Sequence, residues 1–229
     1  MPMYQLLGGK FRDKVRVYCD TDVDGKHTGH DMGLALKKRM EMGFTFLKMD
    51  LGIGLLLDEP GTINAPLGFI DDMKKYAPHI LNVQGGSVTA DMVKAQKSYS
   101  IVTTAHPFTG IHLTEKGLDY LENYVKEVRD VIGYEVPLAI DHFGHVCVED
   151  CIRFARRMEP YNLAWLEDMV PWMYTDQYVR LKNSTTIPIA TGEDIYLKEG
   201  FETLIKAGGV SVIHPDILTC GGNAQCAGA

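Results

Sequence analysis

The sequence predicts an α/β fold in which parallel strands follow the curve of a βα barrel. Apolar strand-like segments alternate with amphipathic helical segments in about six βα units, and strands joined in this way pair in parallel through right-handed crossovers. Three of the apolar runs end on an acid, at Asp141, Glu167 and Glu193, one βα unit apart. Such acids converge where the carboxyl ends of the strands form one rim, as in a barrel, whereas an open sheet would spread them along a line.

The first two predicted strands flank one helix. Residues 15–19 have strand composition, and residues 30–43 place apolar side chains at helical spacing before a glycine ends the run. Those apolar side chains are Met32, Leu36 and Met40. Residues 44–50 alternate with period two, so Lys48 lies near the end of the second strand on the same side as Phe46.

The longest predicted helix spans residues 115–133. One stripe of this segment is apolar, and Gly133 suits a left-handed C-terminal cap. The stripe consists of Leu118, Leu121, Val125, Val128 and Ile132. A third strand over 136–141 follows, and then a helix. The inward residues of that helix are predicted to be Cys151, Ile152, Ala155 and Met158.

Three further strands complete the alternation. Residues 163–167 and 187–193 are apolar runs on either side of a helix near 175–183. The segment 197–209 predicts another helix, and 210–216 the sixth strand. The inward residues of that last helix are predicted to be Phe201, Leu204 and Ile205.

The segment from about 51 to 113 interrupts this rhythm. It is rich in Gly and Pro and shows no clear period. Loops of this length in compact domains are usually functional or disordered. Because the segment leaves the second strand at the carboxyl rim, we expect a loop insertion that acts as a lid over an active site.

Composition excludes several classes of protein. The 229 residues carry a formal net charge of -7, which disfavours nucleic acid as a partner because binding to phosphate backbones requires a basic surface. No apolar window approaches the roughly 18 residues of a membrane span, and the N-terminus lacks the pattern of a signal peptide. We therefore expect a cytoplasmic protein. The cysteines follow no CxxC pattern, and Cys147 and Cys151 are interpreted as packing residues.

The acids at the strand ends predict a metal site. Asp141, Glu167 and Glu193 would supply three hard oxygen ligands, a set that suits Mg²⁺. The alternative is that acids at such places cap the helices that follow, and we assign that role to the other acids of these segments. Those acids are Asp150, Asp168 and Asp194.

These segments together resemble the mandelate racemase subgroup of the enolase superfamily. The resemblance is carried by "FLKMD" with Lys48, by the ligand segments "AIDHFGH", "AWLED" and "ATGED", and by "HPDILTCGG" with Asp216. It covers nearly the whole chain except 51–113 and the last residues. It implies a (β/α)8 barrel of which this chain holds part, without the N-terminal capping domain and the last strands. On this basis 1–14 is a lead-in from the capping domain, and 15–229 is the incomplete barrel.

The resemblance also implies the chemistry. Enolase-superfamily sites use a Lys or His base with Mg²⁺ that stabilises an enediolate formed next to a carboxylate. The expected partner is accordingly a small-molecule carboxylate, and a homo-oligomer is expected for the full-length form.

Family members with a lysine base commonly carry it two places after the first lysine, where this chain has Asp50. A single base favours β-elimination, so we expect a dehydratase of a sugar acid or other hydroxy acid. An epimerase, racemase or cycloisomerase and a non-catalytic barrel fragment are the alternatives.

Four residues are predicted to take part in catalysis. Lys48 would add positive charge near the substrate carboxylate, and Asp216 would orient a histidine base on a seventh strand that is not in this chain. His142 and His145 are candidates for the acid that protonates the leaving hydroxyl, although related dehydratases carry this histidine two places after the first ligand, where Phe143 stands. His214 is interpreted as a packed or polar barrel residue.

Overall fold

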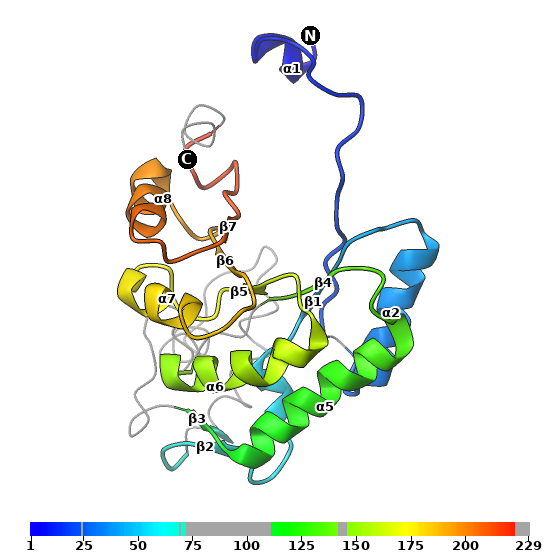
Figure 1. Ribbon diagram of the computed structural model, residues 1–229, viewed down its shortest axis with the longest axis vertical. Coiled ribbons are helices and arrows are strands. Elements are labelled where there is room, and N and C mark those ends of the chain that lie inside the picture. The colour runs from blue at the N-terminus through cyan, green and yellow to red at the C-terminus, as the bar shows by residue number, and fades with distance from the viewer. Residues whose placement is uncertain (24, 69, 72–110, 142–145, 223–229) are drawn as a thin grey trace.

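The computed structural model describes residues 1–23, 25–68, 70–71, 111–141 and 146–222 of the 229-residue chain. Its centre is a curved parallel sheet with helices along the outer side (Figure 1). The strands pair in the order β1 (Leu47–Asp50), β4 (Leu138–Asp141), β5 (Leu166–Glu167), β6 (Ile189–Thr191) and β7 (Val212–Ile213). This strand order follows the chain as in a βα barrel, so the predicted α/β barrel-type fold is confirmed.

Helices follow the strands in turn and bury their apolar stripes against the sheet. They are α2 (Gly29–Glu41), α5 (Glu115–Ile132), α6 (Val148–Met158), α7 (Thr175–Lys182) and α8 (Leu197–Lys206), with a short α1 (Met3–Leu6) and the 3₁₀ turns η1 (Ile53–Leu56) and η2 (Glu159–Tyr161). Thr28 caps the start of α2 by accepting the Asp31 N–H, and α5 ends at Gly133, whose φ is 71°. All five residues of the predicted α5 stripe are buried, as the period required. None of the helices in the described ranges is long and apolar enough to cross a membrane.

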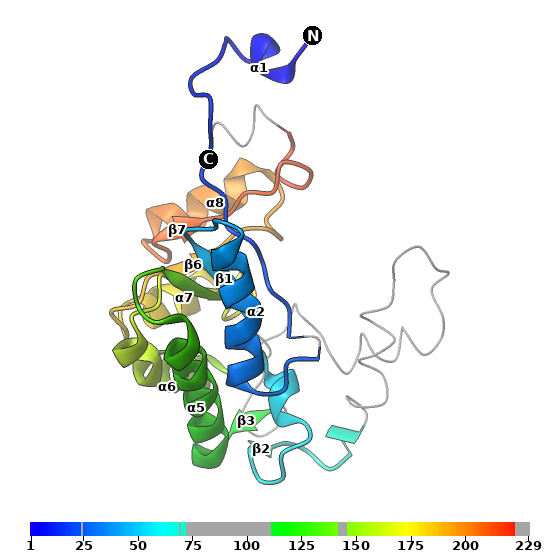
Figure 2. The same cartoon turned by 90° about the vertical axis from the view of Figure 1, so that its right-hand side faces the viewer.

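The predicted strand over 15–19 is wrong except at its last residue. Cys19 forms a single parallel bridge to Leu47, whereas Val15 and Val17 are exposed. Figures 1 and 2 both show that the chain before this segment, with α1, projects away from the rest of the protein. A β-strand is held by backbone hydrogen bonds to a neighbouring strand, and among the described residues this segment pairs in that way only at Cys19, while Arg16 contacts Thr45 through its side chain.

The predicted inward face of α8 is correct for two residues of three. Phe201 and Leu204 are buried, but Ile205 is 43% exposed. Consecutive residues of a helix point about 100° apart, so Ile205 lies at the border of the stripe that faces the sheet.

The predicted insertion lies mostly outside the described residues, since 72–110 are not described. Its two ends are ordered. β2 (Ile63–Asn64) pairs antiparallel with β3 (His112–Leu113), and Ile53 and Leu56 of η1 are buried. The lid role therefore stays a prediction.

The apolar core has two parts that lie on opposite faces of the sheet. The larger part packs between the sheet and the helices. The smaller lies on the inner face and consists of Phe46, Ala139, Trp165, Ala190 and Val212 with Ala164. Because side chains alternate between faces, the residues two positions further along the strands also face inward. Those residues are Lys48, Asp141, Glu167, Gly192 and His214. They lie on the inner face, at the rim formed by the carboxyl ends of the strands.

One close contact fixes the packing of α2 on α5. A Cβ added to Gly29 would lie 2.0 Å from the carbonyl oxygen of Tyr124 on α5. We expect Gly29→Ala to force the helices apart and to lower the free energy of unfolding by about 1–3 kcal/mol, measured by urea denaturation. Gly54→Ala is the control because a Cβ there meets no atom within 4 Å. Equal effects of the two substitutions would contradict the prediction.

Candidate active site

Three predicted site residues converge at the carboxyl ends of β1, β4 and β5. Lys48, Asp141 and Glu167 come from adjacent strands, and all three side chains are buried. The Lys48 ammonium forms ion pairs with Asp141 and with Oε2 of Glu167, the latter at 3.2 Å. Asp141 and Glu167 end β4 and β5, and Lys48 lies within β1 on the same inner face, so the strand order brings the three side chains together at one rim.

Glu167 is held by two further side chains. The Nδ1 atom of His214 lies 2.6 Å from Oε1 of Glu167, and Nε1 of Trp165 donates a hydrogen bond of 2.8 Å to Oε2. Burial acts to raise the pKa of Glu167, but the His214 hydrogen bond and the charge of Lys48 outweigh it, so this pKa lies below its ordinary value. The carboxylate is therefore ionised and fixed in orientation.

Lys48 is the cationic partner of these acids. Burial acts to lower the pKa of Lys48, while the charge of Asp141, the hydrogen bond to it and the charge of Glu167 raise it. The acids prevail, and the pKa lies above the ordinary lysine value. Lys48 therefore carries a positive charge in this arrangement.

Negative charge accumulates around this lysine. Burial raises the pKa of Asp168 to about 7. The hydrogen bond from Thr191 acts to lower this pKa, and the charges of Asp141, Glu167 and Glu193 act to raise it further. Thr191 Oγ1 donates that hydrogen bond to Oδ1 of Asp168 at 2.6 Å. Four carboxyl groups thus influence one another at the rim, which is an arrangement that a bound cation would stabilise.

Glu193 reaches the rim differently from the other predicted ligands. Ala190 faces inward, so the next inward position is Gly192, and Glu193 follows in the turn after β6. Gly192 has φ 150°, and a Cβ there would lie 2.8 Å from the backbone nitrogen of His214. Among the residues that the structure describes, Asp141 has oxygens within 4.8 Å of those of Glu167 and Asp168, and likewise of those of Asp20 and Asp50, and Glu193 is in neither group. The ligand role of Glu193 stays a prediction.

The other predicted catalytic residues lie apart from this cluster or outside the described part of the chain. Asp216 is exposed after β7, and its Oδ1 accepts the Leu218 N–H at 2.8 Å. His142 and His145 lie outside the described residues. The roles of these three residues therefore stay predictions.

Two residues of the cluster are not identified as functional by the sequence alone. Sequence patterns indicate a packing or polar role for His214 and only a place in a strand for Trp165. Their signal is the period of two, because Trp165 precedes Glu167 by two places and His214 follows the inward Val212 by two. The period does not predict that His214, after β7, contacts Glu167 of β5.

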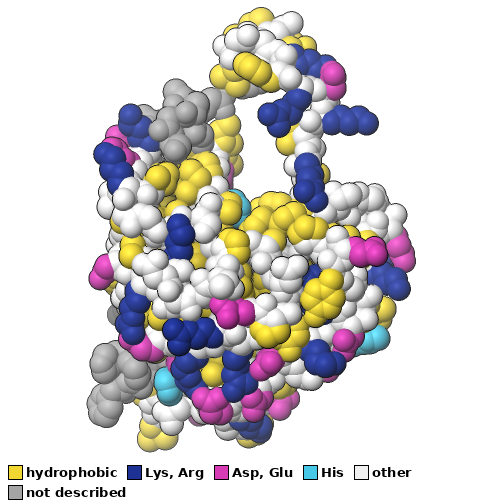
Figure 3. Space-filling model, in the orientation of Figure 1, with side chains coloured by type: hydrophobic (Ala, Val, Ile, Leu, Met, Phe, Trp, Pro, Cys, Tyr) yellow, Lys and Arg dark blue, Asp and Glu magenta, His cyan; other side chains and the backbone are white. Residues whose placement is uncertain are grey.

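Aromatic side chains border the cluster on the inner face. Trp165 stacks on Phe46 with ring centroids 4.7 Å apart, and His214 meets the Trp165 ring edge-on at 5.0 Å. The Tyr18 ring lies 5.4 Å from the Lys48 ammonium. Figure 3 shows hydrophobic side chains gathered in the middle of this view, below the projecting N-terminal segment. Apolar surroundings of this kind strengthen the electrostatic interactions of the cluster.

The donor set fits a magnesium ion. The buried carboxylates of Asp141 and Glu167, with Asp168 beside them, offer hard oxygen atoms within 4.8 Å of one another. Among the described residues this group contains no cysteine, and the imidazole of His214 already contacts the Glu167 carboxylate. Oxygen-rich sets favour Mg²⁺ or Ca²⁺ over zinc.

Comparison with known proteins gives a family match over most of the chain. The family model described as "Enolase C-terminal domain-like" matches residues 31–227. A D-xylonate dehydratase from Haloferax volcanii is 28% identical over 225 residues, which are 97% of this chain and 43% of that protein. A D-galactonate dehydratase family member from Cellvibrio japonicus is also 28% identical, over 98% of this chain and 48% of the relative.

Solved structures show the same fold. A mandelate racemase/muconate lactonizing enzyme-like protein from Rubrobacter xylanophilus superimposes with a TM-score of 0.68 at 25% identity, covering 98% of this chain and 49% of that one. The chain therefore spans about half the length of the relatives and structures that it matches.

Proposed function

Because the chain belongs to the enolase C-terminal domain-like family, we propose that it forms the barrel part of a Mg²⁺-dependent dehydratase of a sugar acid. The observation that carries this proposal is the convergence of Asp141, Glu167 and Lys48 at the rim of adjacent parallel strands. The names of its relatives, D-xylonate and D-galactonate dehydratase, support the substrate class.

Asp141, Glu167 and Glu193 would hold the ion, as the resemblance to the enolase superfamily implies. Bound there, Mg²⁺ would stabilise the charge that develops on the substrate carboxylate when the neighbouring proton is removed. Lys48 would add to the positive charge of the ion and offset part of the charge of the same acids, so an anionic substrate would be repelled less at the rim.

The chain's own residues also favour elimination over racemisation. Racemisation requires proton transfer on both faces of the substrate, and the position of the family's second lysine is occupied by Asp50. Asp216 would orient the base that this mechanism requires, and His142 or His145 would protonate the leaving hydroxyl.

The test is a product assay on the gene product that carries this chain, incubated with Mg²⁺ and a panel of aldonic acids that includes D-xylonate and D-galactonate. A 2-keto product that disappears with EDTA, and in Asp141→Asn and Glu167→Gln, would support the proposal. Asp130→Asn is the matched control, since this acid pairs with Lys126 on exposed α5 surface. Deuterium uptake without a 2-keto product would indicate an isomerase. Magnesium binding with neither result would indicate a non-catalytic barrel.

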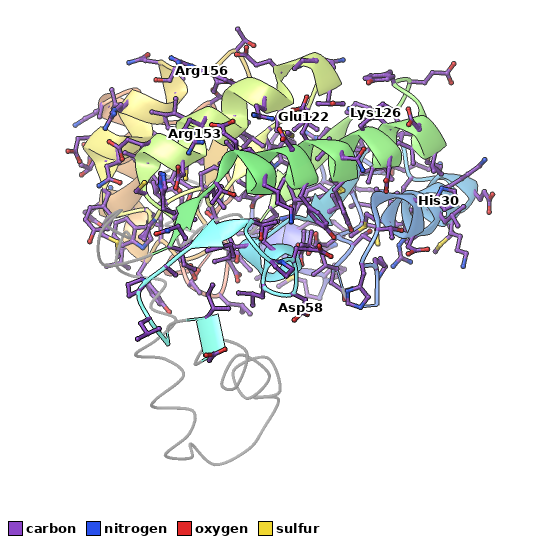
Figure 4. The ribbon with its side chains drawn as sticks, turned by 90° about the horizontal axis from the view of Figure 1, so that it is seen from below. His30, Asp58, Glu122, Lys126, Arg153 and Arg156 are labelled. Atoms are coloured by element: carbon purple, nitrogen blue, oxygen red, sulfur yellow. The ribbon has the colours of Figure 1, made fainter. Side chains whose placement is uncertain are left out.

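His214 is expected to set the magnesium affinity through its hold on Glu167. His214→Ala should weaken Mg²⁺ binding by about 10–100-fold, because it removes the donor that orients a ligand carboxylate. His214→Asn places an amide nitrogen near the position of Nδ1 and should restore part of the loss. Calorimetric titration of the chain measures both, with His30→Ala on the exposed surface of α2 as the control (Figure 4). Unchanged affinity in His214→Ala would contradict the prediction.

A further inference from the structure

A second group of metal-ligating side chains lies away from the rim cluster. It combines His112 of β3, Cys147 at the N-cap of α6 and Asp150 in the first turn of α6. One ligand atom from each of these residues lies within 4.8 Å of the other two. Neighbouring backbone also connects the two segments, since Ile111 bridges Val146 in parallel.

Two of these side chains are removed from solvent. Asp150 is fully buried and Cys147 is 3% exposed, whereas the His112 side chain is 39% exposed. The ring therefore connects the buried pair with solvent, which provides a path for an ion to enter.

The contact between His112 and Asp150 is close but poorly aligned. The Nδ1 atom of His112 is buried and lies 2.8 Å from Oδ2 of Asp150. Among the described residues, however, Nδ1 has no partner that meets the geometry of a hydrogen bond. A buried ring nitrogen that faces a carboxylate without such a bond has lost water without full compensation, and an ion between the two groups would supply it.

Asp150 is already oriented as metal-binding carboxylates are. Its Oδ2 accepts the Leu113 N–H at 2.9 Å, and its Oδ1 accepts a hydrogen bond of 2.8 Å from Arg153. Figure 4 shows Arg153 on α6, which lies alongside α5. Carboxylates that ligate metals are commonly held by outer partners of this kind, which fix the direction of the free lone pairs.

We propose that His112, Cys147 and Asp150 bind one zinc ion that joins β3 to the N-terminus of α6. Imidazole nitrogen, thiolate sulfur and carboxylate oxygen are the three ligand types of zinc, and three protein ligands leave the fourth tetrahedral position for an exchangeable ligand. The two ions differ in chemistry, because a thiolate suits zinc and the rim acids suit magnesium. This site shares no residue with the rim and does not depend on the proposed function.

The distances need only a small adjustment. Zinc bonds of about 2.0–2.3 Å at tetrahedral angles separate ligand atoms by roughly 3.3–3.8 Å. The three ligand atoms all lie within 4.8 Å of one another, and the His112–Asp150 pair lies closer than that range, at 2.8 Å. The His112 side chain is 39% exposed, so its ring has room to turn as an ion enters.

The test is cobalt and zinc titration of the chain after treatment with EDTA. Cobalt should give the near-ultraviolet charge-transfer band of a thiolate ligand, and zinc should abolish it at one equivalent. Cys147→Ser should remove the band, and both Cys147→Ser and His112→Ala should weaken zinc binding by roughly two orders of magnitude or more. His112→Ala changes a half-exposed ring, so its zinc affinity can be measured even if the cysteine variant fails to fold.

Matched variants separate this site from other binding. Cys19→Ser removes another free, half-buried thiol outside the group and should leave the band intact. Asp141→Asn should leave zinc binding unchanged while it removes magnesium binding. The proposal is overturned if wild type shows no thiolate band, or if His112→Ala and Cys147→Ser bind zinc as tightly as wild type.

Discussion

Replacement of Lys48 by methionine is expected to lower the free energy of unfolding by about 3–5 kcal/mol at neutral pH. The substitution keeps the length of the side chain but leaves the buried carboxylates of Asp141 and Glu167 without their lysine partner. The deficit should shrink as the pH falls toward about 4, because protonation of the acids removes the uncompensated charge. Urea denaturation at several pH values measures this effect.

Magnesium should offset the same substitution. Lys48 competes for the oxygens that the ion would bind, so the variant is expected to bind Mg²⁺ more tightly than wild type and to gain more in melting temperature on its addition. If the proposed function holds, the variant is nevertheless expected to lose activity, because it lacks the ammonium that would face the substrate carboxylate. Lys126→Met, which breaks an exposed pair on α5, should change neither property. A Lys48→Met variant as stable as wild type across the pH range would contradict the role of this lysine in neutralising the rim acids.

Replacement of Arg129 by methionine is expected to have an effect of similar size for a different reason. This buried guanidinium donates to the carbonyl oxygens of Tyr161, Gly133, Val136 and Asn162. It thereby joins the end of α5 to the segment before β4 and to the turn after α6. Loss of the donors removes four partly buried hydrogen bonds, at about 0.5–1.5 kcal/mol each, so we expect a total of roughly 3 kcal/mol in urea denaturation.

Arg156 provides the matched control for Arg129. It is exposed on α6 (Figure 4) and donates to one carbonyl, that of Ser184. Arg156→Met should cost less than about 1 kcal/mol. If both substitutions had the same small effect, the four hydrogen bonds of Arg129 would not be important for stability.

The elements with a clear period were predictable. The apolar stripe of α5 and its stop at Gly133 follow from residue order, and the parallel strands that end at Asp141 and Glu167 follow from alternation with helices. Two predictions failed where the period alone gives no information. Residues 15–19 have strand composition but pair with a strand only at Cys19, and Ile205 lies at the border of a helical stripe.

The contacts of the candidate site were only partly predictable. Lys48, Asp141 and Glu167 could be placed at one rim because strand ends of a barrel meet there. The contact between His214 and Glu167 joins residues 47 positions apart, and no local pattern encodes such a contact. The same holds for His112 and Cys147, which meet because β3 and the start of α6 are neighbours in space.

By itself, the sequence determined the α/β class, the order of the parallel strands and the acids that end them, because these features depend on local periodicity and on chain connectivity. Only the tertiary structure decided that Lys48 neutralises two acids at once, that His214 orients Glu167, and that a histidine, a cysteine and an aspartate form a second group. The physical reason is that charge compensation and ligand geometry depend on distances of a few ångströms between segments far apart in the chain.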